Sequence, residues 1–388
     1  MRKIAVVTVA RSDYGLYTPI FDEILSRSGL ELQIIAAASH LSTRFGKTVD
    51  QIQADGYPLA ATVEMTQEDD GPEAVNRATA LGINGFSAAY SQLRPDILLL
   101  LGDRYEMHAA GLAAVPHLLP VAHIHGGEES EGAIDNVLRH SLTKLSHIHF
   151  ASTELHAQRI RQMGEAAERV FVTGAPGIDR IKKSPVPPFS ELLAALPSPL
   201  SRPYILATFH PVTTEPGEAY SQATAFLRAV LKSGMPTLLT MPNADTGGLE
   251  VRRAIADFRA KPGELVAVEN LGARLYLTAM ANACLVAGNS SSGIIEAASF
   301  GLPVVNVGDR QAGRARSGNV LDCGAGEASI LEAITEALSE GFLAHCKKVP
   351  NIYGDGNAAR RIVEVLEGLV LTPGFIRKTF QDQAILRG

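Results

Sequence analysis

The chain alternates short apolar runs with longer helical patterns along almost its whole length, and this alternation limits the folds open to it. The run Ile97–Leu101 is apolar at every position, and residues 4–9 are nearly so. A strand that is apolar on both faces is buried on both faces, which is typical of a parallel sheet with helices on each side. We therefore predict an α/β fold with strands at residues 4–9, 32–37, 61–65, 97–101, 121–125, 148–151, 170–173, 204–208, 237–241, 265–268, 284–287 and 304–307.

Helical patterns fill the intervals between these runs. Two proline clusters, at residues 184–188 and 197–199, interrupt the alternation near the middle of the chain. Proline clusters of this kind are typical of a linker or an irregular crossover. We predict two Rossmann-like, doubly wound domains, at residues 1–184 and 200–357, with a ligand cleft between them, and we expect residues 358–388 to pack back on the first domain. The predicted helices are residues 16–27, 45–54, 74–93, 108–114, 134–145, 154–163, 218–232, 249–259, 275–282, 293–300, 329–338 and 358–369.

Composition excludes several classes of protein. The 388 residues are 46% hydrophobic and 20% charged, which is typical of a globular chain rather than a disordered one. The formal net charge of -6 disfavours a nucleic-acid partner, and no apolar stretch reaches membrane-spanning length. Cys284, Cys323 and Cys346 are widely spaced, which fits neither a disulfide framework nor a zinc site. We expect a cytoplasmic protein with no membrane partner.

Polar residues follow two consecutive predicted strands of the first domain. Gly102-Asp103-Arg104 ends one strand, and His123-Ile124-His125-Gly126-Gly127-Glu128 forms the end of the next. In an open parallel sheet, the carboxyl ends of the strands line the ligand crevice. Acids, imidazoles and a cation that converge there predict an active site. The alternative is a sheet edge whose polar residues have only structural partners.

Two strand-to-helix turns have the composition of anion sites. Arg11-Ser12-Asp13 follows the first strand, and the run from Gly288 to Glu296 follows a strand of the second domain. Backbone N–H groups at the start of a helix attract phosphate, and an acid such as Glu296 in the first turns could accept ribose hydroxyls. Neither turn is the G-x-G-x-x-G of a dinucleotide site. The alternative in both turns is helix capping by serine or aspartate.

Further polar residues end other strands of the second domain. His210 could hydrogen-bond a phosphate or assist its departure, although a lone histidine is more often structural. Asn243 follows the next strand, and a later loop carries Arg310, Arg314 and Arg316. The alternative for these three cations is an exposed basic loop.

Neither a metal nor a cofactor has positive support in the sequence. The chain lacks a Walker A motif, a C-x-x-C pair and an H-E-x-x-H helix. Several histidines look like metal ligands by number alone, but their spacing can place them on different faces, so we expect no metal and no cofactor. These histidines are His117, His123, His125, His140, His147 and His149.

Taken together, these motifs resemble the hydrolysing UDP-N-acetylglucosamine 2-epimerases of the sialic-acid and legionaminic-acid pathways. Each motif is weak alone, but their order along nearly the whole chain is specific. The resemblance rests on Arg11-Ser12-Asp13-Tyr14, Gly102-Asp103-Arg104, His123 to Glu128, Ile134-Asp135, Arg139-His140, Thr143-Lys144, His210-Pro211, Gly288 to Ser291 and Gly308 to Gln311.

The resemblance implies a glycosyltransferase-B-like fold in which the second domain holds UDP and the first performs proton chemistry. It implies removal of the sugar C2 proton, loss of UDP to give a 2-acetamidoglycal, and addition of water at C1. The implied catalytic residues are Asp103, His125, Glu128, Asp135 and His210. The implied substrate-binding residues are Arg11, Arg104, His210, Asn243, Ser290, Ser291, Glu296 and Arg310.

His125 departs from the sialic-acid branch, which tends to have glutamate at this position. We expect UDP-N-acetylglucosamine as the substrate, converted into N-acetylmannosamine and UDP. The alternative is UDP-N,N'-diacetylbacillosamine, because the pattern around His125 looks closer to the branch that acts on that sugar. Rival functions are a non-hydrolysing epimerase, a glycosyltransferase of the same architecture and a non-catalytic nucleotide-sugar sensor. The resemblance also implies a homo-oligomer, either a dimer or a tetramer.

Overall fold

The chain forms two compact units, each built on its own parallel sheet. Our computed structural model describes residues 1–66, 71–131, 134–183, 185–215, 217–242, 247–258, 260–261 and 263–382. The first unit contains Met1–Glu128, Asp135–Lys182 and the chain from Tyr353 onward, and the second contains Glu129–Ile134 and Lys183–Ile352. None of the described helices is long and apolar enough to cross a membrane.

The first unit contains a seven-stranded parallel sheet with the order β3-β2-β1-β4-β5-β6-β7. The order reverses between β1 and β4, which pair in parallel with Val6 opposite Leu99. Ligands of open α/β sheets bind outside the carboxyl ends of the strands at such a reversal. The strands are β1 (Arg2–Thr8), β2 (Leu30–Ala37), β3 (Leu59–Val63), β4 (Ile97–Leu101), β5 (Val121–Ile124), β6 (Ile148–Ala151) and β7 (Val170–Val172).

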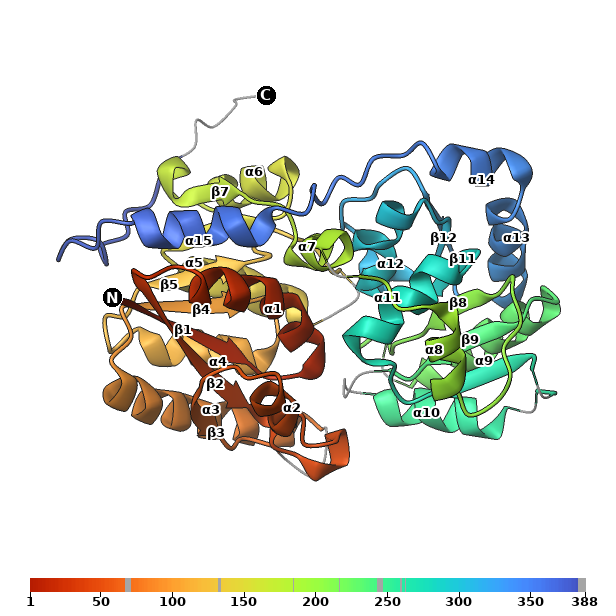
Figure 1. Ribbon diagram of the computed structural model, residues 1–388, viewed down its shortest axis with the longest axis horizontal. Coiled ribbons are helices and arrows are strands. Elements are labelled where there is room, and N and C mark those ends of the chain that lie inside the picture. The colour runs from red at the N-terminus through yellow and green to blue at the C-terminus, as the bar shows by residue number, and fades with distance from the viewer. Residues whose placement is uncertain are drawn as a thin grey trace. The chain divides into compact units, whose positions relative to one another are not determined.

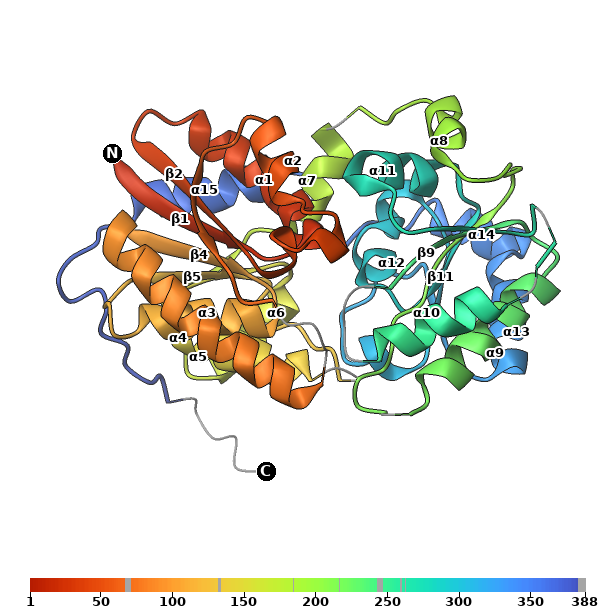
Figure 2. The same cartoon turned by 90° about the horizontal axis from the view of Figure 1, so that it is seen from below.

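Helices cover both faces of this sheet. Figure 2 shows α1 (Arg11–Leu25) and α15 (Ala358–Gly368) on one face, and α3, α4 and α5 on the other. The blue α15 lies beside the red α1 in Figure 1, so the end of the chain packs against its start. The remaining helices of this unit are α2 (Val49–Ala54), α3 (Pro72–Leu93), α4 (Tyr105–Ala114), α5 (Asp135–Leu145), α6 (Glu154–Gln162) and α7 (Pro176–Lys183).

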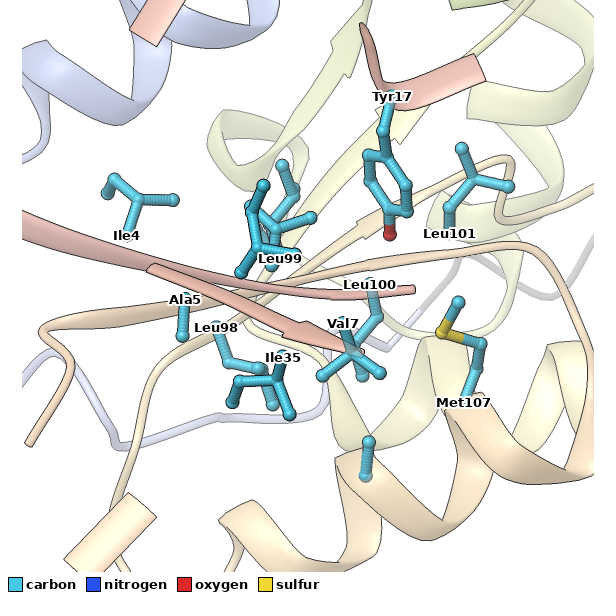
Figure 3. Packing of buried hydrophobic residues seen from close by; sticks show 14 of the residues in the cluster. Ile4, Ala5, Val7, Tyr17, Ile35, Leu98, Leu99, Leu100, Leu101 and Met107 are labelled. Carbon is cyan, nitrogen blue, oxygen red and sulfur yellow. The ribbon is translucent and has the colours of Figure 1, made fainter. Parts of the chain in front are cut away.

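The central strands of the first unit are buried on both faces. Figure 3 shows Leu99 and Leu101 on one side of the sheet with Tyr17 of α1, and Leu98 and Leu100 on the other side. Successive side chains of a strand point to opposite faces, so a run of five apolar residues supplies both cores at once. This is why the continuous apolar pattern of β4 predicted a covered parallel strand.

Both ends of α15 are tied to the first unit. The buried Asp179 carboxylate accepts hydrogen bonds from the backbone N–H groups of Ala358 and Ala359, each at 2.8 Å, at the start of the helix. The Arg2 guanidinium donates to backbone carbonyls at the other end, including that of Glu367 at 2.8 Å. A carboxylate at the N-terminus of a helix and a cation at its C-terminus both interact favourably with the helix dipole and stabilise the helix.

The second unit contains a six-stranded parallel sheet with the order β10-β9-β8-β11-β12-β13. Figure 2 shows α9, α10 and α13 on one face and α8, α11 and α12 on the other. The strands are β8 (Ile205–Thr208), β9 (Thr237–Thr240), β10 (Leu265–Val268), β11 (Leu285–Gly288), β12 (Val304–Val307) and β13 (Val320–Cys323). The helices are α8 (Phe189–Ala195), α9 (Ala219–Lys232), α10 (Gly248–Asp257), α11 (Gly272–Asn282), α12 (Ser291–Ile295), α13 (Glu327–Ala337) and α14 (Glu340–Cys346).

The predicted fold class is confirmed, and each predicted strand overlaps an observed one. The prediction missed β13, α7, α8 and α14. It also joined residues 293–300 into one helix, whereas α12 ends at Ile295 and a 3-10 turn follows at Ala297–Phe300.

Candidate active site

One buried arginine joins the polar residues that follow β4 and β5. Arg139, on α5, donates to the Asp103 carboxylate and to the backbone carbonyl of His125, the latter at 3.2 Å. Its Nη1 lies 3.5 Å from Glu128 Oε2. The strands that carry Asp103 and Glu128 are neighbours in the sheet. The structure therefore brings Asp103, His125 and Glu128 together around a single guanidinium.

The His125 and Glu128 side chains form a buried pair. His125 Nδ1 lies 2.5 Å from Glu128 Oε1, and the two side chains are 7% and 1% exposed. Glu128 Oε1 also accepts a hydrogen bond of 2.6 Å from the Ser152 hydroxyl, which in turn lies 2.8 Å from His156 Nδ1. Since burial of a carboxylate is costly unless it is hydrogen-bonded, these partners explain how Glu128 is kept inside the unit.

The glycines between these two residues permit a close approach to α6. Gly127 has a positive φ of 73°, and a Cβ there would lie 2.3 Å from the carbonyl oxygen of His156. His125 itself has a φ of 65°, an uncommon conformation for a residue with a side chain. This local backbone turns the imidazole toward Glu128.

Most of the other histidines have structural partners. His123 Nε2 lies 2.7 Å from the carbonyl oxygen of Gly102, and burial lowers the pKa of His123 to about 3. His149 Nε2 lies 3.0 Å from Glu165, which also binds Lys144 and Lys378. In the part of the chain that the structure describes, no three His, Cys, Asp or Glu residues are placed to hold a metal ion.

Three other predicted residues of the first unit lie at helix starts. Asp135 is the first residue of α5, one turn before Arg139, and is partly exposed. Arg104 makes a bidentate ion pair with Glu106, with distances of 3.0 and 3.1 Å. Arg11 is exposed at the first position of α1. The position of Arg11 fits an anion-binding role at a helix N-terminus.

The neighbouring Asp13 has a structural role. Its carboxylate accepts hydrogen bonds from the backbone N–H groups of Val9 and Ala10, at 2.8 and 2.7 Å, and from the Thr8 hydroxyl at 2.9 Å. Burial raises the pKa of Asp13 to about 6 and outweighs these hydrogen bonds, which lower it. The alternative that Asp13 caps the turn is confirmed.

In the second unit, Asn289 fixes the loops after β8 and β11. Its side chain accepts from the backbone N–H of His210 at 2.7 Å and donates to the carbonyl of His210 at 2.9 Å. The Asn289 carbonyl accepts from Arg310 Nη1 at 3.3 Å and from Gln311 Nε2 at 3.0 Å. The structure therefore brings His210 and Arg310 close to the start of α12.

The turn into α12 carries the predicted serines. Ser290 caps the helix through the N–H of Ser292, and Ser291 is the first helical residue. Glu296 was predicted within the first turns of this helix, but α12 is short and Glu296 follows its last residue, 5% exposed. Asn243 lies outside the described residues.

The predicted alternative of an exposed basic loop is wrong for Arg314. Its side chain is 7% exposed and donates to the Ser130 hydroxyl at 3.0 Å and to the Glu129 carbonyl at 3.4 Å. Arg316 binds Asp322 at 2.9 Å. Both guanidinium groups therefore already bind protein acceptors.

Gly288 is expected to tolerate no side chain. Its φ is 125°, and a Cβ would lie 1.9 Å from the carbonyl oxygen of Thr208, where β11 passes β8. We expect Gly288→Ala to destabilise the second unit by about 3 kcal/mol, because two paired backbone strands must move apart. Gly234 is the matched control, with a φ of 74° and no atom within 4 Å of a Cβ, and Gly234→Ala should cost only about 1 kcal/mol. The free energy of unfolding of the second unit can be measured by hydrogen exchange along a urea titration. Equal losses of this free energy in the two variants would show that the clash at Gly288 is absent.

Four of the residues that hold these sites together had no predicted role. Ser152 follows β6 directly, so the strand-end rule that selected Asp103 would also have selected it. Asn289 likewise follows β11 directly, and both Asn289 and Arg139 stand within motifs that carry the resemblance, but an amide and a helical arginine are also typical of structural residues. His156 lies on a helix and gave no such signal.

Comparison with known proteins gives one consistent result. The family model described as UDP-N-acetylglucosamine 2-epimerase matches residues 22–367. A UDP-N,N'-diacetylbacillosamine 2-epimerase (hydrolyzing) of Legionella pneumophila is 36% identical over 97% of this chain and 99% of its own. A GDP/UDP-N,N'-diacetylbacillosamine 2-epimerase (hydrolyzing) of Campylobacter jejuni is 34% identical over 83% and 84%. The crystal structure of UDP-GlcNAc 2-epimerase from Neisseria meningitidis bound to UDP-GlcNAc has a TM-score of 0.80 at 18% identity, over 94% of this chain and 99% of that one.

Proposed function

The chain belongs to the UDP-N-acetylglucosamine 2-epimerase family, and from this membership we propose that it is a hydrolysing enzyme that converts a UDP-linked 2-acetamido sugar into UDP and the free 2-epimeric sugar. We propose UDP-N,N'-diacetylbacillosamine as the substrate, because two relatives with 34% and 36% identity carry that name. The observation that carries the reaction type is the group of Asp103, His125 and Glu128 around Arg139.

The proposed reaction needs two proton transfers and one leaving group. His125 takes the proton from C2, the electron pair of that bond forms the C1–C2 double bond, and the C1–oxygen bond breaks to release UDP. An acid then returns a proton to C2 from the opposite face while water adds to C1 and loses a proton. Asp103 and Asp135 are the proposed acid groups, since both are partly exposed carboxyl groups, Asp103 just after β4 and Asp135 at the start of α5. Positioned acids and bases of this kind accelerate reactions by about 10²–10⁴-fold.

The second unit is the proposed UDP-binding unit. The start of α12 presents backbone N–H groups next to Ser290 and Ser291, and Arg310 adds a cation. This combination suits a diphosphate, which helix N-termini and guanidinium groups both bind. His210 is proposed to stabilise the departing diphosphate, and Glu296 to accept ribose hydroxyls. Asn243, Arg11 and Arg104 stay predicted contacts, and the homo-oligomer and the cytoplasmic location also stay predictions.

Proton NMR of the reaction in D2O tests the proposal. We expect UDP and a free 2-epimeric sugar with deuterium at C2, and a kcat/KM at least about tenfold higher for UDP-N,N'-diacetylbacillosamine than for UDP-N-acetylglucosamine. A site that hydrogen-bonds an extra polar group rejects the analogue that lacks it, and about 1.4 kcal/mol gives a factor of ten.

Four outcomes would contradict parts of this proposal. A deuterated UDP-sugar as the product would identify the non-hydrolysing rival. Transfer of the sugar to an acceptor without C2 exchange would identify a glycosyltransferase, and binding of both sugars without turnover would identify a sensor. A preference for UDP-N-acetylglucosamine would leave the reaction type standing and overturn the substrate.

A further inference from the structure

We propose that Glu128 acts on the reaction through His125, as a positioning residue that keeps Nδ1 of the imidazole protonated and leaves Nε2 to take the C2 proton. The inference rests on the proposed function for the identity of the proton that is moved. It changes the role predicted for Glu128 from the sequence, which was direct catalysis.

The contact between the two side chains determines the tautomer. His125 Nδ1 lies 2.5 Å from Glu128 Oε1, and both side chains are buried. An ionised carboxylate can only accept hydrogen bonds, so the proton of a neutral imidazole must be on Nδ1. His125 Nε2 makes no hydrogen bond to the residues that the structure describes, and it is therefore the nitrogen available to a substrate.

Glu128 is itself held in place from two other elements. Ser152, at the end of β6, donates to Oε1 at 2.6 Å, and Arg139 of α5 lies 3.5 Å from Oε2. With its side chain only 1% exposed, Glu128 is enclosed by protein groups. These contacts suit a residue that orients a neighbour and do not suit one that itself meets a sugar.

The charges around the pair favour a transient imidazolium. Glu128 is the acid nearest to His125, and Arg139 lies between Glu128 and the partly exposed Asp103. Among the residues that the structure describes, His123 on the same strand and His156 on α6 are further titratable groups near the pair. When Nε2 accepts a proton, the Glu128 carboxylate balances the new positive charge.

The pH profile of Glu128→Gln distinguishes a positioning role from a structural one. We expect kcat to fall by about 10–100-fold with KM within about threefold, because the lost interaction strengthens only as the proton moves. The low-pH limb of kcat/KM should move to lower pH by about one unit, since the protonated imidazole loses the carboxylate that stabilises it. A proportional loss at every pH, or a move to higher pH, would overturn the proposal.

A double-mutant cycle and a matched control complete the kinetic test. In a His125→Gln background, Glu128→Gln should change the residual rate by less than about threefold, because residues that act as one unit are strongly non-additive. Full additivity would mean that Glu128 acts on the substrate by itself and would overturn the proposal. The control is Glu165→Gln, a glutamate that is 2% exposed and lies 3.0 Å from His149, which should leave the pH limb in place.

The tautomer can also be measured without any substrate. In protein labelled with nitrogen-15 at histidine, with the His125 signals assigned by their loss in His125→Gln, we expect the proton on Nδ1 of the wild type. A proton on Nε2 would overturn the inference whatever substrate the enzyme uses. Absence of turnover with either UDP-sugar, by contrast, would overturn the proposed function and leave a protonated Nδ1 as support for the pair.

Discussion

Asp103→Asn is expected to lower kcat by about 10³-fold, equivalent to about 4 kcal/mol, while the affinity for UDP stays within about twofold. Asparagine keeps the size and the hydrogen-bonding oxygen of Asp103 but cannot give or take a proton near neutral pH. The side chain is 24% exposed at the carboxyl end of β4, whereas the residues proposed to bind UDP lie mainly in the second unit. The measurement is UDP release under saturating substrate, with UDP affinity determined by calorimetry.

The same strand provides the control for this variant. Asp96 lies just before β4, at its amino end, where its carboxylate accepts a 2.8 Å hydrogen bond from the backbone N–H of Lys3. Asp96→Asn should leave kcat within about twofold, because active sites of open parallel sheets lie at the other end of the strands. Full activity in Asp103→Asn would remove Asp103 from the proton chemistry. An equal loss of kcat in both variants would show that the substitutions act by disturbing the sheet and not the proton chemistry.

Strands could be predicted from the sequence where a continuous apolar run is the dominant local pattern. The strands Ile97–Leu101, Ile148–Ala151, Leu265–Val268 and Val304–Val307 were predicted with their observed bounds, because each is a short apolar run bounded by polar or turn residues. The strand β13, at the edge of its sheet, was missed because Asp322 interrupts its apolar pattern and its residues are only partly buried. Edge strands lack the two-sided burial that makes a central strand recognisable.

The helices that were missed lie where local signals conflict. The helix α8 stands between two proline clusters, and its core contact is Leu192. Proline predicts a break in the chain, but seven residues between two breaks still form a helix when one face packs against α11. Tertiary contact of this kind decides the structure of short segments and leaves little trace in composition.

The site could be predicted as a set of residues but not as a set of contacts. The strand-end rule selected Asp103, His125 and Glu128, and the structure places them together. The rule gave no reason to separate the buried Glu128 from the partly exposed Asp103, because burial depends on β6 and α6, which follow later in the chain. It also passed over Arg139, which lies on a helix, although that residue binds two of the strand-end groups directly.

Replacing Arg139 with methionine is expected to destabilise the first unit strongly. Its guanidinium is 2% exposed and is the cation shared by Asp103 and Glu128. Methionine fills a similar volume but removes the guanidinium from both carboxylates, and breaking a buried ion pair from one side costs about 3–5 kcal/mol. That loss is a large fraction of the total stability of a typical domain, about 5–15 kcal/mol.

The second unit serves as an internal reference for this loss. Two-domain chains need not unfold in one step, so hydrogen exchange of individual peptides is a better measure than a single melting temperature. In Arg139→Met, exchange should accelerate in β4, β5 and α5 and stay unchanged in β8 and β11.

Arg161→Met is the matched control, since Arg161 pairs with Glu154 on the surface of α6, with side chains 31% and 59% exposed. It should cost less than about 1 kcal/mol because exposed ion pairs contribute little. If Arg139→Met lost no more protection than Arg161→Met, the three groups around Arg139 would not depend on its charge. The site would then have to be stabilised by packing and by contacts such as those of Ser152 and His125 with Glu128.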